Sequence, residues 1–106
     1  MSFKFTTNDD VSTLHESIAK FVPRYIENRK TDYQKFLIDI EKRDFQSIRD
    51  YCHKVVGTAK SYHFHQLEEI TLVIQNCARE QNLEGIRSII PSYDTYMNEL
   101  FAKYLP

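Results

Sequence analysis

His53 is the side chain with the clearest potential for chemistry in this sequence of 106 residues. A free imidazole has a pKa of about 6.5, so it is largely neutral near pH 7 and can act as a nucleophile. Gly57 follows His53 by four residues. On a helix, side chains at this spacing lie over one another and lean toward the N-terminus, so a glycine here would leave the imidazole uncovered. An uncovered imidazole suits phosphoryl transfer, because it can accept the group from a partner and later release it.

The residues around His53 have the spacing of an amphipathic helix. At about 100° per residue, His53 falls outside the apolar arc and should face solvent. Asp44 is a good N-cap, and we expect the helix to run from there to about Ser61. Glycine inside a helix costs about 1 kcal/mol relative to alanine, so Gly57 favours a functional reason for its presence. The inward stripe consists of Phe45, Ile48, Cys52, Val55 and Ala59.

Cationic side chains on the same face could hold a phosphoryl group during its transfer. Lys60 lies two turns after His53, and Arg49 lies one turn before it. Their role would be to position the phosphoryl oxygens and neutralise their charge. Ordinary solvated surface charges would look the same in the sequence.

The helix that carries His53 needs other helices to form a core beneath it, and the sequence predicts three more long helices and a short N-terminal one. Only two glycines and three prolines occur, and apolar residues recur at helical spacing almost throughout, which predicts an all-α protein. A short N-terminal lid helix is expected over about residues 10–22, capped by Asp9 or Asp10. Pro23 then ends it or starts the first bundle helix, which should reach about Arg43. The expected inward stripe of that helix is Tyr33, Phe36, Leu37 and Ile40.

The second half of the chain predicts two more helices. One follows a link at residues 62–65 and ends near Asn82, and the last continues past Pro91, where we expect a kink. Short links make neighbouring helices antiparallel. The predicted fold is therefore an up-and-down antiparallel four-helix bundle, with the N-terminal helix laid across one end. The inward residues are Leu67, Ile70, Ile74, Cys77 and Ala78 in one helix, and Ile86, Ile89, Ile90, Tyr93, Tyr96, Met97, Leu100, Phe101 and Tyr104 in the other.

Composition narrows the classes of function. With 14 basic and 15 acidic residues, the chain has no cationic footprint for nucleic acid. Its apolar runs are far shorter than the roughly 18 residues that cross a membrane, and its first ten residues lack the apolar stretch of a secretion signal. Cys52 and Cys77 fall on inward stripes, as expected for small buried residues in a reducing cytoplasm. We expect one cytoplasmic domain of 106 residues with no nucleic-acid or membrane partner.

The chain resembles the histidine-containing phosphotransfer (HPt) domain over about residues 24–104. The resemblance rests on the segments His53-Lys54-Val55-Val56-Gly57-Thr58-Ala59, Tyr62-His63-Phe64 and Ile74-Gln75-Asn76-Cys77-Ala78. It implies that His53 accepts a phosphoryl group from the aspartate of one receiver domain and passes it to another. Gln75 and Arg79 fall where polar side chains often flank the site in that family, and their i, i+4 spacing places both on one helix face.

The resemblance also implies the partners and the cofactor. Response-regulator receiver domains, a hybrid histidine kinase, or both would be the partners of a monomeric carrier without kinase activity of its own. The carrier would bind no cofactor, and the receiver would supply Mg²⁺.

Two positions depart from the pattern of the family. Val56 stands where a lysine is usual, so the positive charge would have to come from Lys60, Lys54 or Arg79. His63 stands where glycine is common, so a bulkier residue must make that turn.

Two other functions compete with phosphotransfer. A helical adaptor could dock a receiver or another signalling partner through the same surface without being phosphorylated, and the missing lysine favours this alternative. A metal-storing bundle could use His63, His65 and Cys52, but two ligands in one link lack the usual closing pair.

Overall fold

The computed structural model describes residues 14–105, and within them the chain is all-α, as predicted. Five α-helices and one 3-10 turn follow one another, and no strand occurs among these residues. The elements are α1 (Glu16–Ala19), α2 (Val22–Glu41), α3 (Phe45–Ala59), η1 (Lys60–Tyr62), α4 (His65–Arg79) and α5 (Leu83–Tyr104). None of these helices is long and apolar enough to cross a lipid bilayer.

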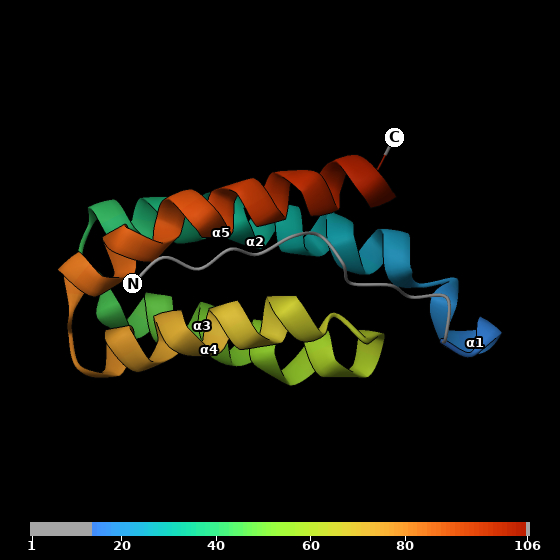
Figure 1. Ribbon diagram of the computed structural model, residues 1–106, viewed down its shortest axis with the longest axis horizontal. Coiled ribbons are helices and arrows are strands. Elements are labelled where there is room, and N and C mark those ends of the chain that lie inside the picture. Colours follow the sequence, from blue (N-terminus) through green and yellow to red (C-terminus); the bar gives the residue numbers. More distant parts are fainter. Residues whose placement is uncertain (1–13, 106) are drawn as a thin grey trace.

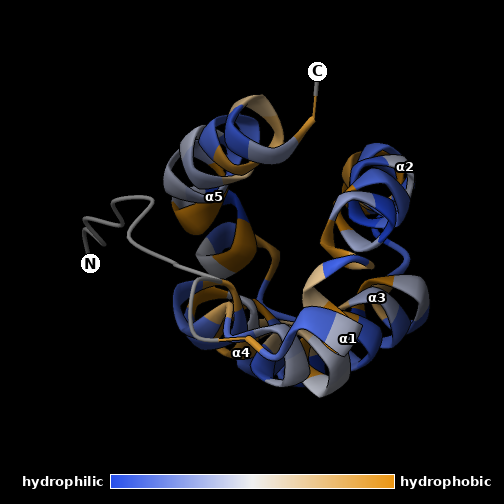
Figure 2. Cartoon of the chain, turned by 90° about the vertical axis from the view of Figure 1, so that its right-hand side faces the viewer, coloured by the Kyte–Doolittle hydropathy of each residue, from blue (hydrophilic) through white to orange (hydrophobic). Residues whose placement is uncertain are grey.

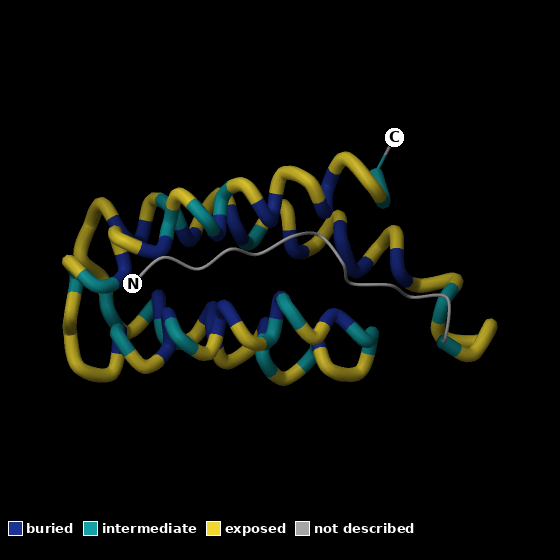
Figure 3. The backbone as a smooth tube through the Cα atoms, viewed as in Figure 1, coloured by how far each residue is buried: buried dark blue, intermediate teal, exposed yellow. Residues whose placement is uncertain are grey.

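The four long helices form an antiparallel bundle of two layers, with α2 and α5 in one and α3 and α4 in the other (Figure 1). The apolar side of each helix faces the bundle axis (Figure 2), and the buried residues follow that side along the whole length (Figure 3). Helix α3 packs most extensively against α4 and also contacts α2. His53 therefore lies on a helix that packs against both α4 and α2. The largest fully buried side chains are Tyr93, Tyr96, Phe36, Phe64, Ile26 and Ile48.

The ends of the helices follow from local side-chain chemistry. Ser47 N donates to Asp44 Oδ1 at 3.1 Å, so Asp44 is the N-cap of α3, as expected. Asn82 caps α5 in the same way, because Gly85 N donates to its Oδ1 at 2.9 Å. Three links contain a non-glycine residue in the left-handed region, with φ of 56° at Arg43, 62° at His63 and 54° at Gln81. His63 thus makes the turn between η1 and α4 with a left-handed backbone.

The N-terminal helix is shorter than predicted. Its single turn begins at Glu16, because His15 has an extended backbone (φ −62°, ψ 143°) and its Nδ1 accepts a hydrogen bond from Ser17 N. A new helix begins at Val22, with Pro23 in its first turn. Within the described residues, the predicted helix over residues 10–22 is therefore confirmed at Glu16–Ala19 and is interrupted at His15 and at residues 20–21, and its proposed caps Asp9 and Asp10 lie outside the described residues. The helix does lie at one end of the bundle (Figure 1).

The last helix, α5, contains Pro91 without a break in the helix, and the kink expected there stays a prediction.

A row of hydrogen-bonded hydroxyl groups crosses the core and joins three helices. Tyr93 Oη lies 2.7 Å from Tyr51 Oη and 3.1 Å from Thr71 Oγ1, which joins α5 to α3 and α4. Burial raises the pKa of Tyr93, so its hydroxyl keeps its proton. These hydrogen bonds satisfy polar groups that would otherwise destabilise the core.

Candidate functional site

His53 lies in the third turn of α3 and is exposed, as its place outside the apolar stripe predicted. Within residues 14–105, no hydrogen bond or ion pair involves its ring. The opposite face of α3 is fully buried at Ile48, Cys52 and Val55. The imidazole is therefore carried on a helix that is packed against the core, and its ring nitrogens make no hydrogen bond or ion pair with the described residues.

Gly57 is also exposed, and the space around it is open. A Cβ atom built on Gly57 would meet no atom of the described residues within 4 Å, apart from its own helix backbone and its chain neighbours. No packing contact therefore requires a glycine at this position. Glycine in a helix interior costs about 1 kcal/mol relative to alanine, and no packing contact of Gly57 offsets that cost.

Helix α4 packs against α3 and carries the predicted site residues Gln75 and Arg79. Gln75 is only 6% exposed, and within residues 14–105 its amide has no hydrogen-bond partner. Because α3 and α4 are antiparallel and joined by a short turn, Gln75 is offset from His53 by about 6 Å along the axis and Arg79 by about 12 Å, at 1.5 Å per residue. Along the helix axis, Gln75 is thus nearer to His53 than Arg79 is. On α3 itself, Val56 is half-buried.

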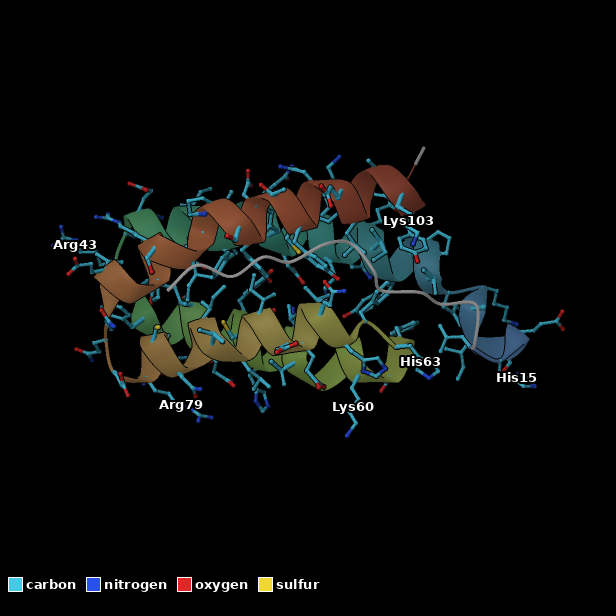
Figure 4. All side chains as sticks on the ribbon, viewed as in Figure 1. His15, Arg43, Lys60, His63, Arg79 and Lys103 are labelled. Atoms are coloured by element: carbon cyan, nitrogen blue, oxygen red, sulfur yellow. The ribbon has the colours of Figure 1, made fainter. Side chains whose placement is uncertain are left out.

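The predicted cations are not gathered around His53. Lys60 and Arg79 project from the bundle toward opposite ends of the α3–α4 layer (Figure 4). Arg49 has a partner on its own helix, because its Nη2 donates to Gln46 Oε1 at 2.7 Å. The structure therefore brings neither Lys60 and Arg79 together nor Arg49 toward the imidazole.

Lys54, the residue next to His53, has a partner on another helix. Its Nζ lies 3.5 Å from Asp32 Oδ2, and Arg29 Nη2 donates to the same oxygen at 2.8 Å. Arg29 and Asp32 were not predicted as site residues. Their signal in the sequence is the place of Arg29 on the inward stripe of α2, three residues after Ile26 and four before Tyr33.

Arg29 is the centre of a polar cluster between α2 and α3. It is 6% exposed, its Nη1 donates to Thr58 Oγ1 at 3.3 Å, and its guanidinium lies 5.0 Å from the centre of the Tyr25 ring. Tyr25 Oη is 2.8 Å from the same Thr58 oxygen, and burial raises the pKa of Tyr25. Arg29 Nε is buried without a partner among the described residues. The cluster holds the guanidinium in place from three sides.

A polar cleft of about 190 Å³ adjoins this cluster. Both helices contribute to its wall, and Lys35 Nζ donates to the buried Asp39 Oδ2 at 2.9 Å inside it. Lys54 and Lys35 are thus two lysines of one cleft, each paired with an aspartate of α2. The lining residues are Asp32, Lys35 and Asp39 from α2, and Ser47, Asp50, Tyr51 and Lys54 from α3.

The remaining candidate groups form no second site. Burial raises the pKa of the Cys52 thiol to about 12 and also raises that of Cys77, so both thiols are protonated and weakly reactive near neutral pH. The rings of His63 and His65 stack with centres 5.9 Å apart. Within residues 14–105, no group of three or more histidine, cysteine, aspartate or glutamate side chains is placed to hold a metal ion.

Comparison of the chain with models of protein families, with curated proteins and with solved structures finds no match.

Proposed function

We propose that this chain is a phosphoryl carrier of a multistep two-component phosphorelay, in which His53 accepts a phosphoryl group from a receiver-domain aspartate and passes it to another receiver. One observation carries the proposal: an exposed histidine without a partner in the described chain is followed, one helical turn later, by a glycine that packing does not require. The resemblance of residues 24–104 to HPt domains supports the same function.

The chemistry needs little from the carrier beyond an accessible nucleophile. A lone pair on one imidazole nitrogen attacks the phosphorus of the aspartyl phosphate, and a P–N bond forms as the P–O bond breaks. The electron pair leaves on the aspartate carboxylate, and the other ring nitrogen keeps its proton. The receiver supplies Mg²⁺ for the phosphoryl oxygens, so the carrier itself needs no metal.

The chain contributes orientation and access in this proposal. Helix α3 fixes the imidazole, and the open space at Gly57 lets the receiver's aspartyl phosphate approach in line with the attacking nitrogen. The Gln75 amide is available to donate to a phosphoryl oxygen. The candidate cations are of two kinds. Lys54 contacts Asp32 and Arg49 donates to Gln46, whereas Lys60 and Arg79 project from the bundle (Figure 4).

The test is transfer of label from phosphorylated receiver domains in the presence of Mg²⁺. We expect acid-labile label on the wild-type chain and none on the His53→Gln variant, because the nucleophile is removed. His65→Gln is the matched control, since it removes an exposed histidine from the next helix and should keep the label. Both variants should keep the helical signal and melt within about 0.5 kcal/mol of wild type, as exposed substitutions usually do. Label that persists in His53→Gln would contradict the assignment.

A non-phosphorylated helical adaptor is the second candidate, and the distribution of cations favours it. Val56 occupies the place of the usual lysine, and neither Lys60 nor Arg79 reaches toward the middle of α3 (Figure 4). In the same experiment, an adaptor would bind receivers and take up no label.

A further inference from the structure

Asp32 contacts two cations, and the two contacts are unequal. Arg29 Nη2 lies 2.8 Å from Asp32 Oδ2, and the Arg29 side chain is 7% exposed. Lys54 Nζ lies 3.5 Å from the same oxygen, and its side chain is 57% exposed. Charge-assisted hydrogen bonds are typically about 2.7–2.9 Å long, so only the Arg29 contact has full strength.

Lys54 can leave Asp32 at little cost. The exposed ion pair is weak and screened by salt. Arg29 remains beside Asp32 when Lys54 departs, so the carboxylate is not left without a partner. Arg29 is itself held by Thr58 and by the ring of Tyr25.

Lys54 is also the cation next to His53 in the sequence. The two side chains leave α3 about 100° apart, and the flexible stem of four carbons on Lys54 can turn toward the imidazole. The phosphoryl group brings a charge of nearly −2, which attracts the ammonium more strongly than a carboxylate that is already neutralised. Lys60 and Arg79 point away from the bundle near its opposite ends (Figure 4), and Arg49 donates to Gln46.

We propose that Lys54 is the phosphoryl-binding cation of this carrier, and that Asp32 and Arg29 hold it in reserve. Before transfer the Lys54 ammonium rests on Asp32. As negative charge arrives on His53, the ammonium moves to the phosphoryl oxygens, and Arg29 alone neutralises Asp32. This inference rests on the proposed function of His53. A cation that engages only when the charge arrives stabilises the transition state and the phosphorylated state more than the free carrier.

The test uses phosphoramidate as the phosphodonor, because no partner protein is then required. Attack by the imidazole nitrogen forms the new P–N bond as the P–N bond of zwitterionic phosphoramidate breaks, ammonia leaves with the electron pair, and the ring keeps its N–H proton. The rate of labelling and the ³¹P chemical shift of the phosphohistidine are measured for each variant.

We expect Lys54→Gln to slow labelling on the order of 10-fold, the value of one charge-assisted contact made mainly in the transition state. Lys54→Arg keeps the charge and should stay within about 3-fold of wild type. Lys35→Gln is the matched control, because it removes a lysine of the same cleft that is paired with Asp39 on its own helix. It should leave the rate and the ³¹P shift unchanged, whereas Lys54→Gln should move the shift.

Asp32→Asn tests whether Asp32 holds the Lys54 ammonium before transfer. Release of Lys54 should speed labelling by about 3-fold, since the weak exposed pair is lost. In the Lys54→Gln background, Asp32→Asn should have no effect on the rate.

The outcomes separate this inference from the proposed function. Equal rates for Lys54→Gln and Lys35→Gln, or a gain from Asp32→Asn that persists without Lys54, would overturn the reserve while His53 is still labelled. A wild-type chain that takes no label on His53 would overturn the proposed function and this inference with it. If Asp32→Asn fails to fold, the comparison of Lys54→Gln, Lys54→Arg and Lys35→Gln still decides the role of Lys54.

Discussion

Gly57 and Gly85 both lie inside helices, but their surroundings are opposite. A Cβ on Gly57 would meet nothing within 4 Å. A Cβ on Gly85 would lie 2.5 Å from Asn82 Nδ2, 2.9 Å from Asn82 Cγ and 3.0 Å from Cys77 Sγ. A side chain at Gly85 would require the Asn82 side chain to shift, whereas a side chain at Gly57 would meet no described neighbour.

The difference assigns separate causes to the two glycines. Gly85 belongs to the first turn of α5, where Asn82 must fold over the helix end to accept a hydrogen bond from Gly85 N. It serves the fold. Gly57 gives up helix propensity on an exposed face beside His53 and gains no contact in return. It is the position where a reason outside the fold is needed, and access to His53 supplies one.

Among the glycine variants, Gly57→Leu should give the largest effect on activity. Leucine is a good helix former, and the space is open, so the variant should fold. Its side chain would lean over His53 and disturb the alignment with the donor phosphate, which can reduce the rate on the order of 100-fold. The measurement is a time course of transfer from a phosphorylated receiver, beside a thermal melt. Full activity of the folded variant would show that access does not explain Gly57.

Gly85→Ala should instead reduce stability. The new methyl group would push Asn82 away from the helix end, and loss of such a cap costs about 1–2 kcal/mol, less the small gain in helix propensity. Urea unfolding gives the change in the free energy of unfolding. Transfer at a temperature where the variant is folded should match wild type, so a large loss of transfer in the folded variant would break the contrast between the two glycines.

The sequence predicts most of the fold because its main determinants are local. The cap at Asp44 and the apolar stripes define the helices, and they place His53 on the solvent side of α3. The N-terminal helix was overestimated, since the extended backbone at His15 depends on a local hydrogen bond to Ser17 that competes with helix propensity.

The charged part of the site could not be predicted in the same way. Arg29 is buried because Asp32, Thr58 and Tyr25 satisfy it from two helices, and their relative register is set by packing. A pattern along one helix shows only that a charge falls on an apolar stripe. Tyr51 was missed in the core for a related reason, because its hydroxyl is satisfied by Tyr93 on α5.

The double variant Asn82→Ala/Gly85→Ala sharpens the assignment of Gly85. Asn82→Ala alone should cost about 1 kcal/mol, as the loss of an N-cap usually does. The Asn82→Ala change removes the two atoms closest to the methyl group of Gly85→Ala, and Cys77 Sγ at 3.0 Å remains, so the second change should cost little more. A double-mutant cycle from urea unfolding should therefore show a coupling of about 1 kcal/mol. Strict additivity would mean that Gly85 is required for a reason other than its contact with Asn82.

Gly57→Ala should give the smallest effect, and its sign is informative. The methyl group enters open space, so the variant gains helix propensity and loses no contact. The free energy of unfolding should rise by up to about 1 kcal/mol. A methyl group is too short to cover the imidazole, so transfer should stay within about 3-fold of wild type, far from the loss expected for leucine. Urea unfolding beside the transfer time course measures both. A lower stability for Gly57→Ala would contradict the open surroundings of Gly57 and would place it with Gly85 as a glycine required by the fold, leaving His53 alone to support phosphotransfer.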